Sequence, residues 1–486
     1  MWDHFLRNAT FWLPLTVYTI LLFVDAGPLR LGGDGYYSWI FARSAALDGD
    51  LNFANDYAQC GDRLGVGLEW VAGRPDNPFY VGGALLWAPL LAMVRGAAAL
   101  TGELSWLRAH SCSGSFVRMF LVAGPLAGAI SVHVAYLCAK RVAGMRAARW
   151  STWAWGFGIP MMQYSGIDAH YSHVYLTALV AAWLWWLLEA PEQAAVTRRW
   201  LFIGAAICFG ITMMRITAVT LLLPALASLL ARHNSGKRFN VALLLAPAIG
   251  ASSGIACMFA IYMYTYGNAL HVPQGPYFFH FDNAHPWLVL FGIHGGFFFW
   301  SPFAWVGLAG VIHGICTGKH KALHGFFLTS FAFALYLDST VLNWDGDWSL
   351  GARRLVPFTP VFVLWTAIGL RLMARRFARS NVLHPGVELG FGAAAIALGI
   401  SGTLTASGAH QVTQREVFGE AIGVGRVWAP LDKRGIDLAL LPAELYYALR
   451  YGMPWSSYRA AITPYLFRDY LSLAPARDVI DRKSVV

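Results

Sequence analysis

Long apolar runs separated by short polar segments dominate the chain. A helix that spans a lipid bilayer needs about 20 mainly apolar residues. Eleven segments fit this pattern, namely 9–26, 116–138, 150–164, 171–188, 200–214, 216–231, 240–265, 302–317, 322–341, 356–372 and 387–407. Two further apolar stretches, 79–100 and 287–300, are ambiguous by hydropathy alone. The pattern predicts an all-α polytopic membrane protein.

Basic residues next to the predicted spans set their orientation, because lysine and arginine collect on the cytoplasmic side. Sixteen basic residues and only two acids lie in these segments, which carry +14 when the whole chain carries +10. The basic residues are Arg7, Lys140, Arg141, Arg146, Arg149, Arg198, Arg199, Arg232, Lys237, Arg238, Lys319, Lys321, Arg371, Arg375, Arg376 and Arg379. Placing all of them inside requires that neither 79–100 nor 287–300 crosses the membrane. The N-terminus is then cytoplasmic and the C-terminus external, and the positive charge orients helices rather than binding nucleic acid.

Composition agrees with this interpretation. The chain is 57% hydrophobic and 13% charged, whereas about a quarter of an ordinary soluble domain is charged. A disordered chain and a water-soluble globule are thereby excluded. We expect a transmembrane module at 1–407 with a long first external loop at 27–115, in which 79–100 lies at the interface, and an external cap at 408–486. Large external loops favour chemistry at the outer face.

The first external loop opens with Gly32-Gly33-Asp34-Gly35-Tyr36-Tyr37, just beyond the first predicted span. Glycines on both sides let the backbone turn sharply and leave the Asp34 carboxylate accessible. One interpretation is a general base at the lipid–water boundary. The other is an aspartate that caps the short amphipathic helix expected to follow.

Acids and amides alternate through 48–56, which ends at Asp56. Such residues can bind Ca²⁺, but the glycine and glutamate that an EF-hand loop requires are missing. Asx turns are therefore favoured, and Asp56 is a second candidate acid. Cys60 and Cys112 are the two cysteines of the external loops. A disulfide between them in an oxidising periplasm and a pair of free thiols are the alternatives.

Asp168, His170 and His173 flank the start of the predicted 171–188 span. The two histidines are three residues apart and would share a helix face. A metal pair needs further ligands that the sequence does not specify, so hydrogen bonds to a substrate or headgroup are favoured. Arg215 interrupts the apolar run 200–231, where a charge is costly and often functional. A phosphate partner and snorkelling to the surface are both open interpretations.

Two later segments combine polar and aromatic residues. His294 belongs to a histidine-containing aromatic loop at 267–300, whose spacing matches no standard zinc site and favours a sugar or headgroup. The segment that precedes the 356–372 span contains Trp344, Asp345, Asp347, Trp348, Arg353 and Arg354. Tryptophan suits stacking on a sugar, and a pair of guanidinium groups suits phosphate. The alternative is that the arginines pair with Asp345 or Asp347.

The order of these features resembles the C-superfamily of membrane glycosyltransferases, which includes protein O-mannosyltransferases and the aminoarabinose transferase of lipid A. The segments that carry the resemblance are GGDGYYSWIFARSAALDGDLNF, RPDNPFYVGGALLWAPLL, HGGFFFWSP and DGDWSLGARRLVPFTP. They span most of residues 1–372. One departure is Asn77-Pro78, where many relatives have a His-Pro-Pro turn beside a second acid.

The resemblance implies an inverting transferase that moves a sugar from a polyprenyl-phosphate donor to a glycan, lipid or protein acceptor outside a bacterial inner membrane. Asp34 would be the base, and Arg353, Arg354 and Arg215 would bind the donor phosphate. We expect the substrate site to be lined by Tyr36, Tyr37, Asp56, Asp168, His170, His173, His294, Trp344, Asp345 and Trp348. No cofactor is obligatory, and no metal ligands are assigned, although a divalent cation is compatible. The alternatives are a polymerase or ligase of lipid-linked glycans, which uses a diphosphate donor, and a transporter or flippase.

Overall fold

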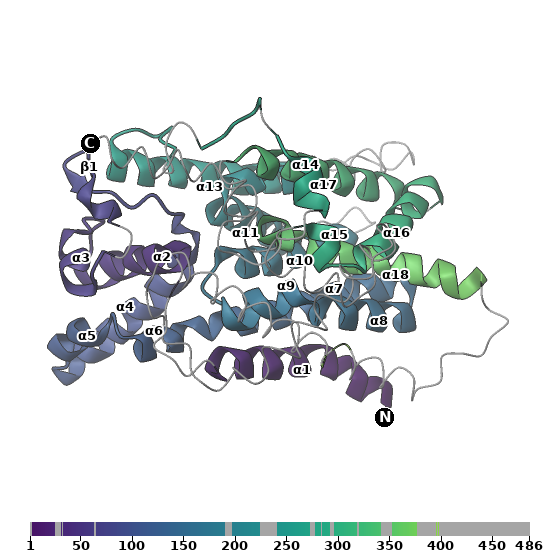
Figure 1. Ribbon diagram of the computed structural model, residues 1–486, viewed down its shortest axis with the longest axis horizontal. Helices are drawn as coiled ribbons and strands as arrows, with labels where there is room; N and C mark the ends of the chain where they lie inside the picture. Colours follow the sequence, from purple (N-terminus) through teal and green to yellow (C-terminus); the bar gives the residue numbers. More distant parts are fainter. Residues whose placement is uncertain are drawn as a thin grey trace, which may run out of the picture. The chain divides into compact units, whose positions relative to one another are not determined.

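The computed structural model describes residues 2–24, 31, 33–62, 65–189, 197–223, 241–272, 278–282, 284–291, 296–317, 320–341 and 352–376, with isolated positions at 395 and 397. Most of these residues are helical (Figure 1). The α-helices are α1 (Trp2–Val24), α2 (Gly33–Arg43), α3 (Ala54–Cys60), α4 (Ala84–Thr101), α5 (Leu104–His110), α6 (Gly114–Leu121), α7 (Ala123–Ala143), α8 (Met145–Gly156), α9 (Ile159–Met162), α10 (Ser172–Glu189), α11 (Arg198–Met214), α13 (Ala242–Tyr266), α14 (Pro286–Phe291), α15 (Phe297–Trp300), α16 (Ala304–Thr317), α17 (Lys321–Thr340) and α18 (Thr359–Arg376).

Shorter elements connect these helices. Two are π-helical, η1 (Ser44–Asp48) and η4 (Gln163–Ile167). Four are 3₁₀-helical, namely η2 (Val66–Leu68), η3 (Val81–Gly83), η5 (Ile216–Leu222) and η6 (Arg353–Phe358). Strands β1 (Trp70–Val71) and β2 (Arg74–Pro75) form a small antiparallel hairpin in which Trp70 pairs with Pro75.

The long helices pack into a bundle in which α7 contacts α1, α8, α10 and α18, while α11 packs on α13 and α16 on α18. Glycines allow the close approaches. A Cβ at Gly310 of α16 would lie 1.9 Å from the carbonyl oxygen of Trp365, and one at Gly250 of α13 would lie 2.1 Å from that of Ala205. Small residues at such contacts are typical of helices that associate within lipid, where close backbone packing stabilises the pair.

Several described helices are apolar enough to cross a membrane, so the chain is a multi-pass helical membrane protein. Four pass by length and composition: Val81–Thr101, Gly114–Ala143, Ala242–Tyr266 and Arg353–Arg375. The pair Ile159–Ile167 and Ser172–Glu189 is long and apolar enough only when taken together, and its bend of 117° is that of a broken span or a re-entrant segment. The total of eleven spans stays a prediction, as does the interfacial placement of 79–100. The predicted 387–407 span and the cap at 408–486 fall outside the described helices.

Some predicted spans are interrupted. The stretch 150–164 is not one helix, because α8 ends at Gly156 and α9 and η4 follow. Pro160 lies at the start of α9, where it is tolerated but cannot continue the preceding helix. The stretch 216–231 begins as the 3₁₀-helix η5, and within 287–300 the described residues form two short helices, α14 and α15.

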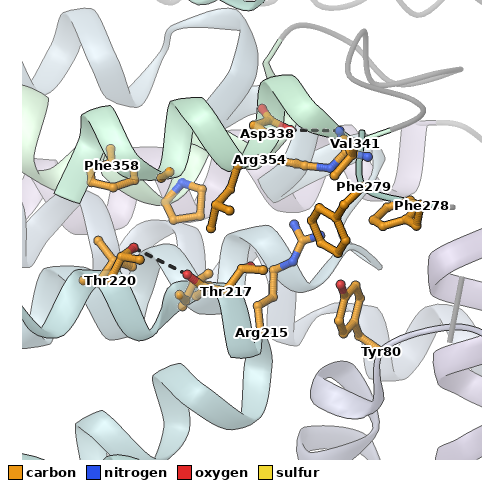
Figure 2. Close-up of a pocket in the computed structure, with 16 residues that line it drawn as sticks. Tyr80, Arg215, Thr217, Thr220, Phe278, Phe279, Asp338, Val341, Arg354 and Phe358 are labelled. Atoms are coloured by element: carbon orange, nitrogen blue, oxygen red, sulfur yellow. Dashed lines mark hydrogen bonds and ion pairs between the residues drawn. The ribbon is translucent and has the colours of Figure 1, made fainter. Parts of the chain in front are cut away.

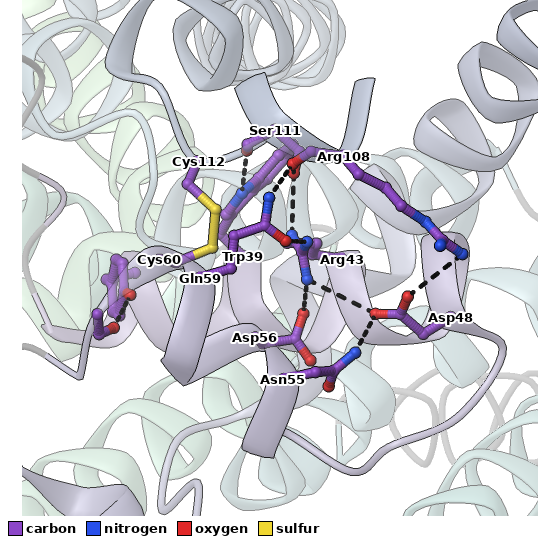
Figure 3. Close-up of a disulfide and its surroundings, with 12 residues drawn as sticks. Trp39, Arg43, Asp48, Asn55, Asp56, Gln59, Cys60, Arg108, Ser111 and Cys112 are labelled. Carbon is purple, nitrogen blue, oxygen red and sulfur yellow. Dashed lines mark hydrogen bonds and ion pairs between the residues drawn. A yellow bond between two sulfur atoms is a disulfide. The ribbon is translucent and has the colours of Figure 1, made fainter. Parts of the chain in front are cut away.

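The elements of the first loop, α2 to α6 with the β1–β2 hairpin, lie together at one end of the bundle and share its hydrophobic core (Figure 1). Arg43, the last residue of α2, makes the central polar contacts inside the first loop (Figure 3). Its guanidinium donates to the side chains of Asp56 and Gln59, and its Nε donates to Ser111 Oγ at 2.9 Å. Arg43 therefore ties α2 to α3 and to the α5–α6 connection.

A disulfide between Cys60 and Cys112 lies beside this network, with the Cα atoms 5.4 Å apart (Figure 3). It closes a loop of 52 residues in sequence separation. Cross-linking a loop of this size stabilises a fold mainly by restricting the unfolded chain. The disulfide therefore holds α3 against the segment that leads into α6.

We expect the double variant Cys60→Ser/Cys112→Ser to lose about 2–3 kcal/mol of stability, measured as a lower midpoint of thermal unfolding in detergent. The matched control is Cys257→Ser/Cys316→Ser, since both of these cysteines are free and exposed. A reductant should lower the midpoint of the wild type and the control but leave the Cys60/Cys112 variant unchanged. Equal midpoints for all three proteins would contradict a stabilising role.

Candidate functional site

Asp34 is the second residue of α2, so its carboxylate lies in the first turn of the helix, where the helix dipole favours an anion. The next residue, Gly35, fixes the position of this helix end. A Cβ at Gly35 would lie 2.1 Å from Cδ2 of His170, so only glycine lets α2 approach the turn between η4 and α10. This contact places Asp34 next to the outer end of the bundle.

Asp34 meets Arg353, which is 319 residues further along the chain. Arg353 Nη1 lies 3.6 Å from Asp34 Oδ2; the Arg353 side chain is 9% exposed and that of Asp34 is 35% exposed. The guanidinium also lies over the ring of Tyr171, 5.3 Å from its centroid, a cation–π contact that holds the cation in place. Two residues predicted separately as base and phosphate ligand therefore form one ion pair.

Arg354 points to a different partner from its neighbour. Its Nη1 donates to Asp338 Oδ1 at 2.9 Å, and both side chains are at least 90% buried. Asp338 lies in the last turn of α17, and the two arginines begin η6. The two guanidinium groups that were expected to act as a pair thus face two different carboxylates. Asp345 and Asp347, the acids expected as alternative partners, lie outside the described residues.

Arg215 lies where the sequence predicted a break between two helices. It follows the last residue of α11 in an extended conformation, and η5 begins at the next residue. Arg215 Nη1 lies 3.2 Å from Nδ1 of His173, and its guanidinium is 5.0 Å from the ring centroid of Tyr80. Arg215 therefore points inward and contacts His173 and Tyr80, whereas snorkelling would have taken it to the surface.

Arg215 and Arg354 line one cavity (Figure 2). Asp338, Tyr80, Thr217 and Thr220 supply its other polar groups. The rest of the lining is apolar and consists of Leu176, Ala218, Leu221, Phe278, Phe279, Ala334, Leu337, Val341, Pro357 and Phe358. A cavity with two guanidinium groups and an apolar wall suits an anion that carries an apolar group.

The charges at this end of the bundle act on one another. Arg354 lines the cavity together with Arg215, and it is the direct neighbour of Arg353, which faces Asp34. Arg353 and Arg354 each face a carboxylate, whereas the described contacts of Arg215 are with His173 and Tyr80. An excess of positive charge in a partly dry site attracts an anionic group.

Some predicted site residues make their described contacts away from the cavity. Tyr36 and Tyr37 are buried, and their hydroxyls donate to Gly61 O and to Asp62 Oδ1 respectively. Neither tyrosine is among the described residues that line the cavity. Both hydroxyls bind within the first loop and thereby support α2, and the place of the two tyrosines in the substrate site stays a prediction.

Asp56 is fully buried and paired with Arg43. Burial raises the pKa of Asp56 to about 6, because the loss of water outweighs the favourable charge and hydrogen bond of Arg43. A carboxylate without access to solvent cannot accept a proton from an external hydroxyl. The structure thus places Asp56 in the interior of the first loop. The Asx turns expected nearby are present, since Asp50 accepts from the amide of Asn52 at 3.1 Å.

The polar residues around the start of α10 do not form a single group in the structure. His173 lies in the first turn of α10, whereas His170 precedes the helix, so the expected shared helix face is absent between these two residues. Asp168 accepts from Gln163 Nε2 at 2.8 Å. His294, Trp344, Asp345 and Trp348 lie outside the described residues. Among the residues that are described, no three His, Cys, Asp or Glu side chains come together as a metal site.

Three residues of the site were not singled out by the sequence. Asp338 is the only acid in the predicted 322–341 span, and an ionisable residue in such a span is a signal of function. Tyr80 belongs to the RPDNPFY segment, and Tyr171 stands between His170 and His173. No local pattern marks these two tyrosines, because their role is to face arginines from distant segments.

No family model and no curated protein matches the chain. ArnT from Cupriavidus metallidurans bound to undecaprenyl phosphate is similar in structure, with 15% identity and a TM-score of 0.45 over 89% of this chain and 77% of that one. ArnT in the apo state gives 15% identity and a TM-score of 0.43 over 88% and 76%. The archaeal oligosaccharyltransferase AglB from Archaeoglobus fulgidus, in complex with an inhibitory peptide and a dolichol-phosphate, is also similar in structure. It has 12% identity and a TM-score of 0.47 over 83% of this chain and 56% of that one. The chain thus spans little more than half of AglB.

Proposed function

We propose that the protein is an inverting glycosyltransferase that moves a sugar from a polyprenyl-phosphate donor to an acceptor at the outer face of a bacterial inner membrane. The observation that carries the proposal is the convergence of Asp34 with three arginines beside an apolar cavity. A base, a phosphate-binding group and a wall for a hydrocarbon chain are the parts that this reaction requires.

The cavity suits a lipid phosphate. The guanidinium groups of Arg215 and Arg354 form its cationic part, and Phe278, Phe279 and Leu337 belong to its apolar wall. Arginine binds phosphate through several N–H donors at once. An isoprenoid chain contributes no hydrogen bonds and gains free energy only by contact with apolar surface.

The charge balance favours a monophosphate donor. The diester of a sugar linked through one phosphate carries a single negative charge, which Arg215, the arginine with no carboxylate among its described contacts, can match. A diphosphate-linked donor carries two negative charges and would leave one unmatched in a partly buried site, which is costly. A lipid-linked glycan polymerase or ligase, which uses a diphosphate donor, is therefore the alternative.

In the proposed reaction, the acceptor hydroxyl oxygen attacks the anomeric carbon of the sugar. The bond between that carbon and the phosphate oxygen breaks, and the polyprenyl phosphate leaves with the bonding electron pair. Asp34 accepts the hydroxyl proton. The arginines stabilise the charge that develops on the leaving phosphate. A single displacement inverts the anomeric centre, and no step requires a metal ion, although a divalent cation is compatible with it.

We place the first loop, 27–115, outside the membrane, in agreement with eleven spans, a cytoplasmic N-terminus and an external C-terminus. The disulfide between Cys60 and Cys112 supports this orientation, because disulfides persist in the periplasm and not in the cytoplasm. The acceptor, a glycan, lipid or protein, would then approach from the side of α2. Nucleic acid is not a partner in this proposal.

The test supplies purified, reconstituted protein with two radiolabelled donors, one polyprenyl-monophosphate sugar and one polyprenyl-diphosphate sugar, together with an envelope extract as acceptor. We expect label to move to the acceptor only from the monophosphate donor. Transfer from the diphosphate donor alone would support the polymerase or ligase instead. Movement of intact donor across proteoliposomes without transfer would support a transporter.

A further inference from the structure

The two carboxylate–arginine pairs of the site differ in strength. Arg354 and Asp338 form a 2.9 Å hydrogen bond between side chains that are 10% and 4% exposed. Arg353 and Asp34 are 3.6 Å apart, and the Asp34 side chain is 35% exposed. A separation of 3.6 Å lies beyond hydrogen-bond range, so the pair is held by charge alone. An anion that enters the site will therefore displace Asp34 more easily than Asp338.

Arg353 is anchored independently of Asp34. Its guanidinium lies over the ring of Tyr171, and η6, to which it belongs, packs against α10. The cation therefore keeps its place when its anionic partner changes. Asp34 has no such second contact with the bundle among the interactions described, and it lies at the exposed end of α2.

We propose that Arg353 acts as a switch that binds two anions in turn, first the carboxylate of Asp34 and then the phosphate of the donor, so that donor binding releases the base. This inference rests on the proposed function and extends it to the order of events. While Asp34 faces Arg353, its carboxylate is directed to the guanidinium. Once the donor phosphate binds Arg353, the carboxylate of Asp34 can turn to an acceptor hydroxyl. The donor must then bind before the acceptor can react.

In this proposal Asp34 competes with the donor phosphate for Arg353. The competition can be measured as a change in lipid affinity, without any sugar transfer. The probe is polyprenyl monophosphate, the lipid product, titrated against the full-length protein in nanodiscs. Asp34→Asn removes the competing charge and should bind the lipid about fivefold more tightly than the wild type, which is the range of a partly exposed ion pair. A merely structural aspartate would give unchanged or weaker binding.

The controls separate direct competition from a general change in charge. Asp50→Asn makes the same substitution in the same loop, at a residue whose described contacts are with Ser44 and Asn52, and should leave the affinity unchanged. Arg353→Ala should weaken binding, and adding Asp34→Asn to it should then have no further effect, because the shared cation is gone.

The outcomes separate the two levels of the proposal. If the wild type binds polyprenyl monophosphate but Asp34→Asn binds it no more tightly, the switch is overturned and the proposed function stands. Equal tightening by Asp34→Asn with and without Arg353 also overturns the switch, since the effect is then not exerted through Arg353. If no variant binds the lipid, the proposed function fails and the switch fails with it. Thermal unfolding midpoints confirm that each variant is folded.

Discussion

Asp34→Asn is expected to reduce sugar transfer by about 10³-fold, because a general base contributes 10²–10⁴-fold to such a reaction. Asparagine has the same shape as aspartate but cannot accept the proton of the acceptor hydroxyl. The loss should appear in kcat, measured as label transferred from a polyprenyl-monophosphate sugar in the reconstituted system. Asp34 is partly exposed and lies at a helix end, so the substitution should leave the fold intact.

The control for Asp34→Asn is Asp50→Asn, another aspartate of the first loop, which should keep full activity. Thermal midpoints of the two variants should agree within a few degrees. The assignment of Asp34 as base is contradicted if the Asp34→Asn protein transfers sugar at the wild-type rate. If both variants lose activity and stability together, Asp34 has a structural role in the loop.

Arg353→Ala is expected to lower kcat/KM for the donor by about 100-fold, with little change in KM for the acceptor. The side chain is 9% exposed and contacts both Asp34 and the Tyr171 ring, so its loss removes a positive charge from a partly dry site. Loss of one hydrogen-bonded charge contact to a phosphate in such a setting costs several kcal/mol. The measurement is a pair of titrations, one with varied donor and one with varied acceptor.

Two further variants make the test of Arg353 specific. Arg353→Lys keeps the charge but not the planar group, and it should recover part of the donor affinity. Arg371→Ala is the matched control, since Arg371 lies in the later part of α18, is exposed, and donates to Val142 O at 2.9 Å. Its kinetics should equal those of the wild type. An unchanged donor titration for Arg353→Ala would remove Arg353 from the phosphate site.

The helices were predictable because hydropathy is a local property. Apolar residues over about 20 positions specify a membrane helix whatever surrounds it, and α10, α11, α13 and α17 start and end within about two residues of the predicted spans. The interruptions were harder to predict. The chain remains apolar around Pro160, so its hydropathy predicted one helix. The structure has three short elements there, α8, α9 and η4.

The candidate site was predictable only in part. Arg215 was singled out because a charge within an apolar run is costly and thus signals function. Asp34 was singled out by the glycines on both sides of it, and Arg353 by its position next to a second arginine, which suits phosphate. Tyr36 and Tyr37 were grouped with Asp34 by proximity in sequence, yet both hydroxyls bind within the first loop. Neighbours on a helix point in different directions, so adjacency along the chain does not imply a shared site.

The sequence by itself determined that the protein is a membrane-embedded helical bundle and which charges are unusual, and it predicted how the helices are oriented. Each of these depends on residues within one segment and its preference for lipid or water. Only the tertiary structure decided which charges meet: Asp34 with Arg353, Arg354 with Asp338, and Arg215 with His173. The physical reason is that an ion pair depends on distance through space, and helix packing brings together residues that are hundreds of positions apart.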